Sequence, residues 1–140
     1  MIAVLFMLSL GLGPAQNTNY PDLYTIRSIY IGDMGQSDEA QRFRLLLADA
    51  LSDKGFTVVE KQDQADAVLS GVLAVRVHED TTRARVTVML KSRAGQRLWG
   101  GDFEPRVKLF VKDTVKLRAE DVASRLRKDW NKSAKDAGVG

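Results

Sequence analysis

One stretch of the chain, residues 67–103, restricts the fold more than any other, because apolar and polar side chains alternate along most of it. The alternation is cleanest over 83–91, where every second residue is alanine, valine or leucine and the residues between are mostly charged or polar. A period of two indicates a strand with one buried face and one solvated face. Short polar turns separate three such stretches. We therefore predict an antiparallel meander of three strands, at 67–78, 83–91 and 96–103.

A strand, a helix and a second strand are predicted upstream of the meander. Residues 24–31 are rich in β-branched and aromatic side chains, which favour a strand. Ser37 is a typical helix N-cap, and apolar residues then recur every three to four positions. Gly55 is a typical residue to follow the end of a helix. The helix is expected over 37–53 and a short strand over 56–60.

A second helix is predicted after the meander, over 113–136. Asp113 or Thr114 is suited to cap it, and apolar residues step by three and four along it. The resulting order is β-α-β-β-β-β-α, in which two helices can cover one face of a five-stranded mixed sheet. We therefore predict an α/β (α+β) two-layer sandwich in which residues 24–137 form a single domain, as the length of 140 residues suggests.

The first fifteen residues carry no charged side chain and include an apolar run at 2–12. That run has the length of a signal-peptide core and is shorter than the roughly 20 residues that cross a bilayer. Small residues at Gly13 and Ala15 match the spacing that signal peptidase recognises. We expect a signal peptide at 1–15, a flexible polar lead-in at 16–23, and no transmembrane span in the mature chain. An uncleaved anchor and a buried first element are the alternatives.

The residue types that most catalytic and metal sites need are scarce, because the chain has no cysteine and one histidine, His78. This excludes cysteine nucleophiles, disulfides, and thiolate or multi-histidine metal sites. The Gly32–Gly35 loop joins a strand to a helix, where phosphate-binding loops occur, but neighbouring acidic side chains would repel an anion. Asp63 and Asp66 flank a polar turn without a third acidic ligand. We predict no catalytic residue, metal or cofactor; the alternative is a small ligand-binding protein or hydrolase that uses this loop with Asp33, Asp66 and His78.

The excess positive charge lies in the C-terminal part of the chain. The formal net charge is +3, to which residues 106–136 contribute +5 and residues 16–105 contribute −2. A basic-helix nucleic-acid binder is therefore a second alternative. Acidic residues are interleaved with the basic ones, however, and the region lacks the aromatic platforms of single-strand binders. We expect a solvated helix face and no nucleic-acid partner.

Tryptophans and basic residues in the second half of the chain are the candidates for a protein-binding site. Trp99 is predicted to pack in the sheet or at its edge, with a role as an interface anchor as the alternative. Trp130 belongs to the apolar stripe of the second helix and would become a docking residue if that helix overhung the sheet. The candidate partner-binding residues are Trp99, Arg125, Lys128 and Trp130.

Three short motifs accompany the predicted strands: Gly55, Phe56, Val58, Val59 and Glu60; Ala65, Asp66, Val68, Leu69 and Gly71; and Gly95, Leu98 and Trp99. With them the chain resembles, over roughly residues 24–130, the core of bacterial envelope proteins of the CsgG/TolB-amino-terminal type. The secretion-pore members of that family carry a lipid-bearing cysteine and membrane-spanning hairpins, which this sequence lacks. The resemblance implies an exported, non-enzymatic domain and supplies no catalytic residue.

We therefore expect a periplasmic or secreted envelope protein that acts as a protein-interaction or assembly domain. The expected partner is another envelope protein or a second copy of the chain. Neither the partner nor the oligomeric state follows from the sequence.

Overall fold

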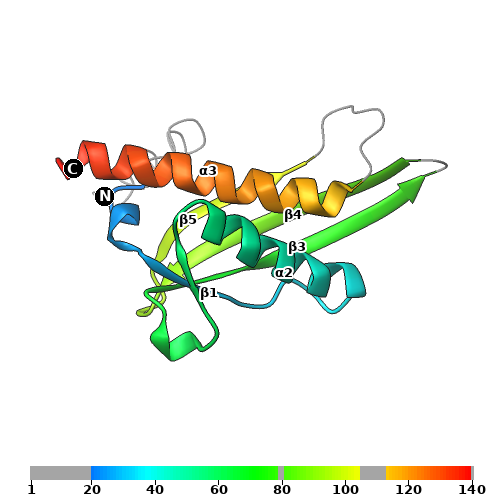
Figure 1. Cartoon of the computed structure of the whole chain (residues 1–140), viewed down its shortest axis with the longest axis horizontal. Coiled ribbons are helices and arrows are strands. Elements are labelled where there is room, and N and C mark those ends of the chain that lie inside the picture. Colours follow the sequence, from blue (N-terminus) through cyan, green and yellow to red (C-terminus); the bar gives the residue numbers. More distant parts are fainter. Residues whose placement is uncertain (1–19, 79–80, 105–112, 140) are drawn as a thin grey trace, which may run out of the picture.

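The computed structural model describes residues 20–78, 81–104 and 113–139, and the predicted signal peptide at 1–15 lies outside them. Five strands form one sheet in the order β2-β1-β3-β4-β5 (Figure 1). β1 is parallel to both of its neighbours, whereas β3, β4 and β5 pair antiparallel, which confirms the predicted mixed sheet and meander. The strands are β1 (Ser28–Ile31), β2 (Thr57–Val59), β3 (Ala67–His78), β4 (Thr81–Ser92) and β5 (Arg97–Phe103).

Two helices, α2 (Asp38–Asp53) and α3 (Thr114–Asp136), pack beside each other on one face of the sheet (Figure 1). Ser37 and Asp113 cap them, and each side chain accepts a hydrogen bond from the backbone N–H three residues further on. The predicted two-layer arrangement is confirmed. Within the described ranges, neither helix is long and apolar enough to cross a membrane.

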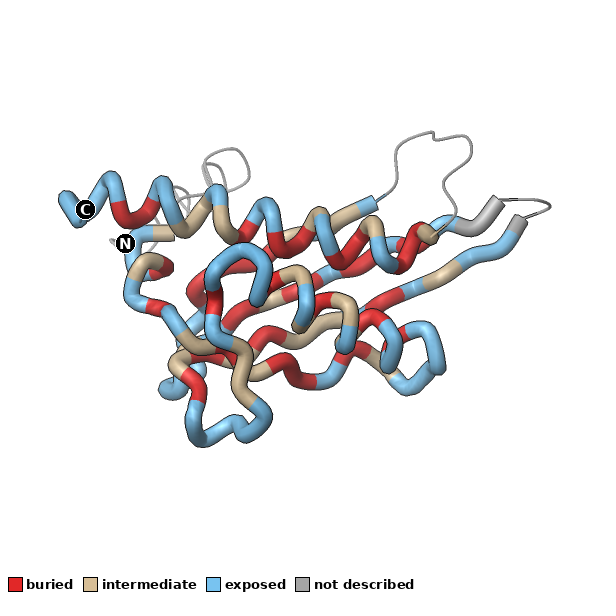
Figure 2. Tube along the Cα trace, in the orientation of Figure 1, coloured by how far each residue is buried: buried red, intermediate tan, exposed pale blue. Residues whose placement is uncertain are grey.

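The core lies between the helices and the sheet, where buried residues line the inner side of both layers (Figure 2). Leu69, Leu90 and Trp99 form one cross-strand row on β3, β4 and β5, and all three are fully buried. Phe43 of α2 and Leu126 of α3 are also fully buried. The apolar half of the alternating pattern therefore faces the helices, as the period of two predicts.

The first strand is shorter than the predicted range of 24–31. β1 begins only at Ser28, and Leu23–Thr25 form a 3-10 turn, η2. The carbonyl oxygen of Ile26 accepts a hydrogen bond from Trp130 Nε1 of α3 at 2.8 Å. The contact of this segment with α3 thus satisfies a backbone group that a longer strand would use for pairing, and it overrides the local strand propensity.

Residues 20–23, which the sequence placed in a flexible lead-in, are packed against the domain. Leu23 is fully buried, and the Tyr20 hydroxyl donates a hydrogen bond to the edge strand β5 at 3.1 Å. Ser133 Oγ on α3 accepts a hydrogen bond from the backbone N–H of Tyr24 at 3.0 Å. Burial of the side chains of Tyr20 and Leu23 offsets the entropy lost on ordering this segment, whereas Pro21 and Asp22 are exposed.

Two residues of the second motif have clear structural roles. The carboxylate of Asp66 accepts hydrogen bonds from the backbone N–H groups of Arg27 and Ser28 at 2.9 and 3.1 Å. The bond from Arg27 is the main reason why the pKa of Asp66 lies below its usual value. At Gly71, a Cβ atom would lie 2.0 Å from the carbonyl oxygen of Thr87 on β4. The motif therefore joins β1 to β3 and permits the close approach of β3 and β4.

Candidate functional site

One face of the sheet has no covering layer among the described residues, because both helices lie on the other face (Figures 1 and 2). We call this surface the open face; it consists of the strand side chains that point away from α2 and α3. Strands lie about 4.8 Å apart, so β3, β4 and β5 give a surface about 14 Å wide. The short strands β1 and β2 widen it to about 24 Å at the end that contains Ala67. A broad sheet surface of this kind is a candidate site for a protein partner.

Apolar side chains lie in the middle of the open face. Val72 of β3 is 64% exposed, which is unusual for a large aliphatic residue in the middle of a strand. Val68 of the same strand and Met89 of β4 are half-buried beside it. These side chains contribute little to the core of this domain. Exposed apolar groups surrounded by polar ones are typical of interaction surfaces.

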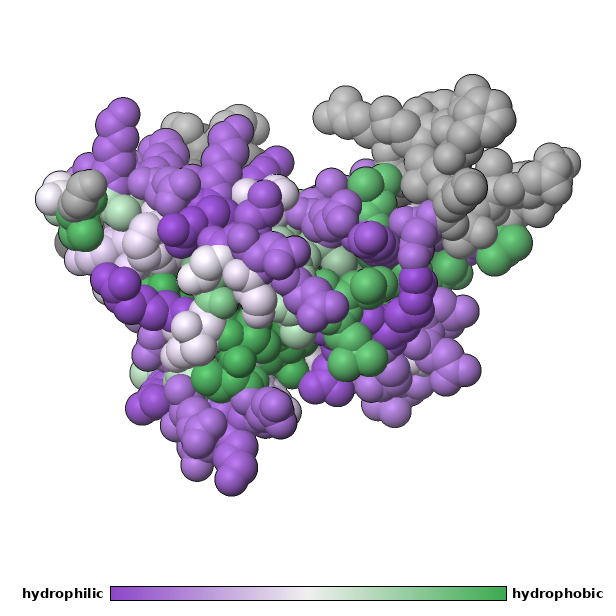
Figure 3. Space-filling view, in the orientation of Figure 1, coloured by the Kyte–Doolittle hydropathy of each residue, from purple (hydrophilic) through white to green (hydrophobic). Residues whose placement is uncertain are grey.

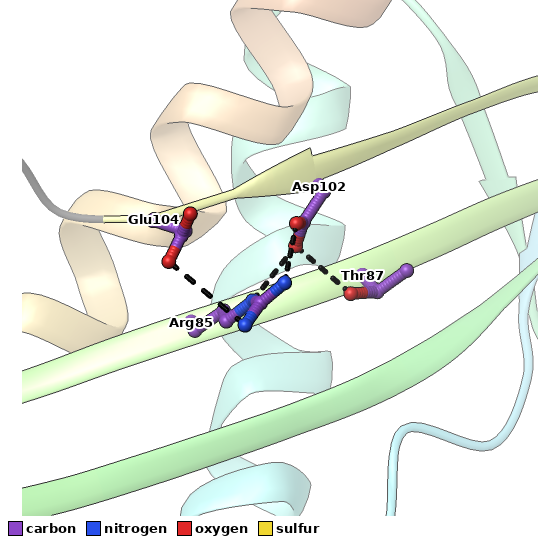
Figure 4. A network of polar contacts seen from close by, with 4 residues as sticks. All are labelled: Arg85, Thr87, Asp102 and Glu104. Atoms are coloured by element: carbon purple, nitrogen blue, oxygen red, sulfur yellow. Dashed lines mark hydrogen bonds and ion pairs between the residues drawn. The ribbon is translucent and has the colours of Figure 1, made fainter.

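An ion-pair network lies on β4 and β5 next to these apolar residues (Figure 4). Arg85 donates hydrogen bonds from Nε and Nη2 to the two carboxylate oxygens of Asp102, at 3.1 and 2.7 Å. Thr87 Oγ1 bonds to the same carboxylate at 2.9 Å, and Glu104 lies 3.9 Å from Arg85 Nη1. The bond from Arg85 lowers the pKa of Asp102, and Asp102 in turn raises the pKa of Arg85. Because these groups are well exposed, the network chiefly fixes their positions.

Like charges oppose each other in two cross-strand pairs of the open face. Arg76 of β3 lies opposite Arg83 of β4, and Lys91 of β4 lies opposite Arg97 of β5. All four side chains are exposed. With Arg85, the described part of this face has five basic residues against the two acidic residues of the network. Like charges directly opposite each other destabilise a sheet, so these two pairs lower the stability of the folded domain.

Trp99, one of the four predicted partner-binding residues, lies in the core. Its side chain is fully buried, and Nε1 donates a hydrogen bond to Asp129 of α3 at 2.8 Å. Its ring lies 6.5 Å from the ring of Tyr20 and 6.2 Å from that of Phe103. Trp99 therefore packs in the core, and a partner has no access to this side chain in the folded monomer.

The other three predicted partner-binding residues lie on α3, which packs on the opposite side of the sheet from the open face. Arg125 and Lys128 are exposed. Trp130 is half-buried, and its ring lies under the guanidinium group of Arg127, 4.6 Å from the ring centre. It borders a shallow surface pocket with Val139. The structure thus brings none of these residues together with the open face.

The residues of the alternative ligand site or hydrolase do not converge. Asp66 precedes β3, Asp33 bonds through its carbonyl oxygen to Gly71 within β3, and His78 is the last residue of β3. A strand of this length extends for about 40 Å. The backbone N–H of Gly35, which a phosphate would need, is bonded to the Asp33 carboxylate at 3.0 Å. In the ranges that the structure describes, no group of three histidine, aspartate or glutamate residues is placed to hold a metal ion.

Sequence reasoning missed the open face as a candidate site. The alternation over 83–91 correctly predicts that Arg83 and Arg85 lie on a solvated face, but a solvated face is not by itself a candidate binding site. The available signal was Val72, an aliphatic residue on the same face as Arg76 of its own strand. The like-charged pairs were not visible, because they depend on the register between strands.

No protein-family model matches the sequence, and no curated protein matches it. Among solved structures, the fold is similar to that of PelC from Paraburkholderia phytofirmans, a dodecamer, with a TM-score of 0.53 and 14% identity over 72% of this chain and 88% of that one. A second PelC dodecamer gives a TM-score of 0.50 and 15% identity, over 74% and 87% of the two chains. Lipoprotein GNA1162 from Neisseria meningitidis gives 0.49 and 16%, over 73% and 95%. The likeness to PelC shows a shared fold.

Proposed function

We propose that this chain is an exported, non-enzymatic envelope protein whose domain assembles with further copies of itself. The observation that carries the proposal is the open face, with its exposed Val72 and its unbalanced positive charge. A sheet that packs helices on one side only can bury its other side against a partner.

The fold likeness supports self-association as the mode of action, because the similar PelC structures are dodecamers. The uncharged, apolar N-terminal segment and the small residues at Gly13 and Ala15 support export to the periplasm or the cell exterior. The motif residues Asp66 and Gly71 hold the strands together, which fits a scaffold built for assembly.

The dispersed positions of Asp33, Asp66 and His78 support a non-enzymatic role. A catalytic site needs its acid, base and nucleophile within hydrogen-bond reach of one substrate. Asp66 and His78 lie at opposite ends of β3, about 40 Å apart, and the backbone of Asp33 lies beside Gly71 between them.

Export is tested by expressing the full chain in a Gram-negative host and sequencing the N-terminus of the protein from each cell fraction. We expect a mature chain in the periplasmic or envelope fraction that begins at Gln16. Ala15→Leu is the matched control and should block cleavage, because signal peptidase requires a small residue there. A chain that keeps Met1 and stays in the cytoplasm would refute export.

Self-association is tested separately, on the purified mature chain, by light scattering coupled to size-exclusion chromatography over a range of concentrations. We expect a defined mass that is a multiple of the protomer mass. A monomer at every concentration would refute the proposed assembly, whatever the outcome for export.

A further inference from the structure

The described surface has an acidic region that matches the basic open face. The outer side of α2 exposes Asp38, Asp49 and Asp53. The two arginines of α2 are each bonded to another part of the same chain, one to a carboxylate and the other to a carbonyl group. α2 has four acidic and two basic residues, a net charge of −2, and Lys54 and Lys116 border the groove that Asp49 and Asp53 line. The open face, in contrast, has an excess of positive charge. We call the outer side of α2 the α2 face.

Each of the two surfaces also exposes a large aliphatic side chain. Leu45 of the α2 face is 71% exposed, and Val72 of the open face is 64% exposed. Leu45 lies one helical turn before Asp49, so the apolar and acidic groups are adjacent. Figure 3 shows hydrophobic side chains gathered around α2 and the neighbouring part of the sheet, with hydrophilic side chains around them. The two surfaces are thus complementary in charge and alike in having an apolar centre.

This distribution of charge discriminates between modes of pairing. Two open faces brought together would oppose their excess positive charges, and two α2 faces would oppose their carboxylates, which is unfavourable in both cases. An α2 face against an open face joins opposite charges and brings Leu45 toward the apolar strip around Val72. This contact uses a different surface on each copy, so each protomer has one surface left to bind the next.

The dimensions are also compatible. α2 has 16 residues and is therefore about 24 Å long, which is within the length of about 40 Å of β3, the strand that carries Val72 and Arg76. A helix on a sheet is, moreover, the packing that this domain already uses on its other face.

We propose that copies of this chain assemble head to tail, with the α2 face of one copy seated on the open face of the next. This inference rests on the proposed self-association and specifies its surfaces. If the rotation between neighbouring protomers divides a full turn evenly, repetition of this contact gives a closed ring. Otherwise it gives a helical filament.

Charge reversal on the open face tests the inference without endangering the fold. The variant Arg83→Glu/Arg97→Glu converts both like-charged pairs, with Arg76 and Lys91, into opposite-charge pairs. We expect an association weakened about a hundredfold or more, since like charges across an interface are strongly unfavourable. At concentrations where both proteins are monomeric, the melting temperature of the variant should be equal or higher. Assembly unchanged in this variant would overturn the inference.

Charge reversal on the α2 face is the reciprocal test. Asp49→Lys/Asp53→Lys places positive charge near the C-terminal end of a helix, where the helix dipole favours it, so the fold should persist. We expect the same loss of assembly. The matched control is Arg125→Glu/Lys128→Glu on the exposed side of α3, which reverses two charges away from both surfaces and should leave assembly intact. Loss of assembly in the control alone would assign the interface to α3 and overturn the inference.

Mixing the two reversed proteins gives the sharpest test. Each variant alone has two surfaces of the same sign and should remain monomeric, but an equimolar mixture restores opposite charges at every junction. We expect assembly to return only in the mixture, with the two variants in equal proportion. A wild-type chain that assembles while the mixture stays monomeric overturns the head-to-tail contact alone; a wild-type chain that is monomeric throughout overturns the proposed self-association as well.

Discussion

Replacing Trp99 by alanine should destabilise the monomer by about 4 kcal/mol, because truncation of a buried Trp side chain costs about 3–5 kcal/mol. The side chain is fully buried in the row formed with Leu69 and Leu90, so a large cavity would remain. Trp99→Phe retains an aromatic ring and removes the hydrogen bond to Asp129. That smaller change should cost about 1–2 kcal/mol, since the half-buried carboxylate can recover water as a partner.

The change in the free energy of unfolding is measured by urea denaturation, with circular dichroism as the signal. A domain of this size has a stability of about 5–15 kcal/mol, so the alanine variant should fold but melt about 15 °C lower. Self-association stabilises a folded protein in a concentration-dependent manner, so the series is best made in the Arg83→Glu/Arg97→Glu background. Trp130→Phe is the control for loss of a tryptophan at a half-buried position.

If Trp99→Ala lowered the free energy of unfolding by less than about 1 kcal/mol, the side chain would not fill the core as described. If Trp99→Ala in the otherwise wild-type chain weakened assembly while stability was preserved, Trp99 would be an interface anchor after all.

Four further predictions address other contacts. Gly71→Ala should prevent stable folding, because its Cβ would lie 2.0 Å from a carbonyl oxygen of β4; a well-folded variant by circular dichroism would contradict the close approach. The folded pKa of Asp66 is lowered, so its stabilising effect is present above the unfolded value of about 4 and is lost as the pH falls through the folded value. Urea titrations should therefore show a gap between wild type and Asp66→Asn at pH 6 that closes in acid, and a constant gap would argue against this role. Ser133→Ala should cost about 1 kcal/mol and increase amide exchange at Tyr24, whose N–H loses its partner; unchanged exchange there would argue against the contact. At concentrations where both proteins are monomeric, Arg83→Glu alone should raise the melting temperature, because the like-charged pair with Arg76 becomes an opposite-charge pair; a lower value would contradict this register.

The elements that the sequence predicts well are those whose boundaries depend on local chemistry. Ser37 and Asp113 cap helices at the expected positions because capping requires only a side-chain oxygen three residues before a free N–H. The range of β3 agrees with the prediction at 67–78 because its alternating pattern and flanking polar turns are contiguous in the sequence.

The features that the sequence does not predict depend on contacts between distant residues. The segment before Ser28 is not part of the strand, because Trp130 donates a hydrogen bond to the carbonyl oxygen of Ile26. These two residues are 104 positions apart in the sequence. The hydrogen bond from Trp99 to Asp129 and the like-charged pair of Lys91 and Arg97 likewise need the fold to be known. Local propensity carries no information on such contacts, which is why the candidate interface emerged only from the register and the layer arrangement.

The contact between the start of the domain and the end of α3 has a consequence for the order of folding. Tyr24 and Ile26 bind Ser133 and Trp130, so these two contacts cannot form until more than a hundred further residues have been made. At about 5–20 residues per second, that delay is about 5–20 s. During this time the chain cannot complete its fold and close on itself. Completion of the domain only by α3 suits the proposed export, because a chain must be unfolded to pass through a narrow translocation channel.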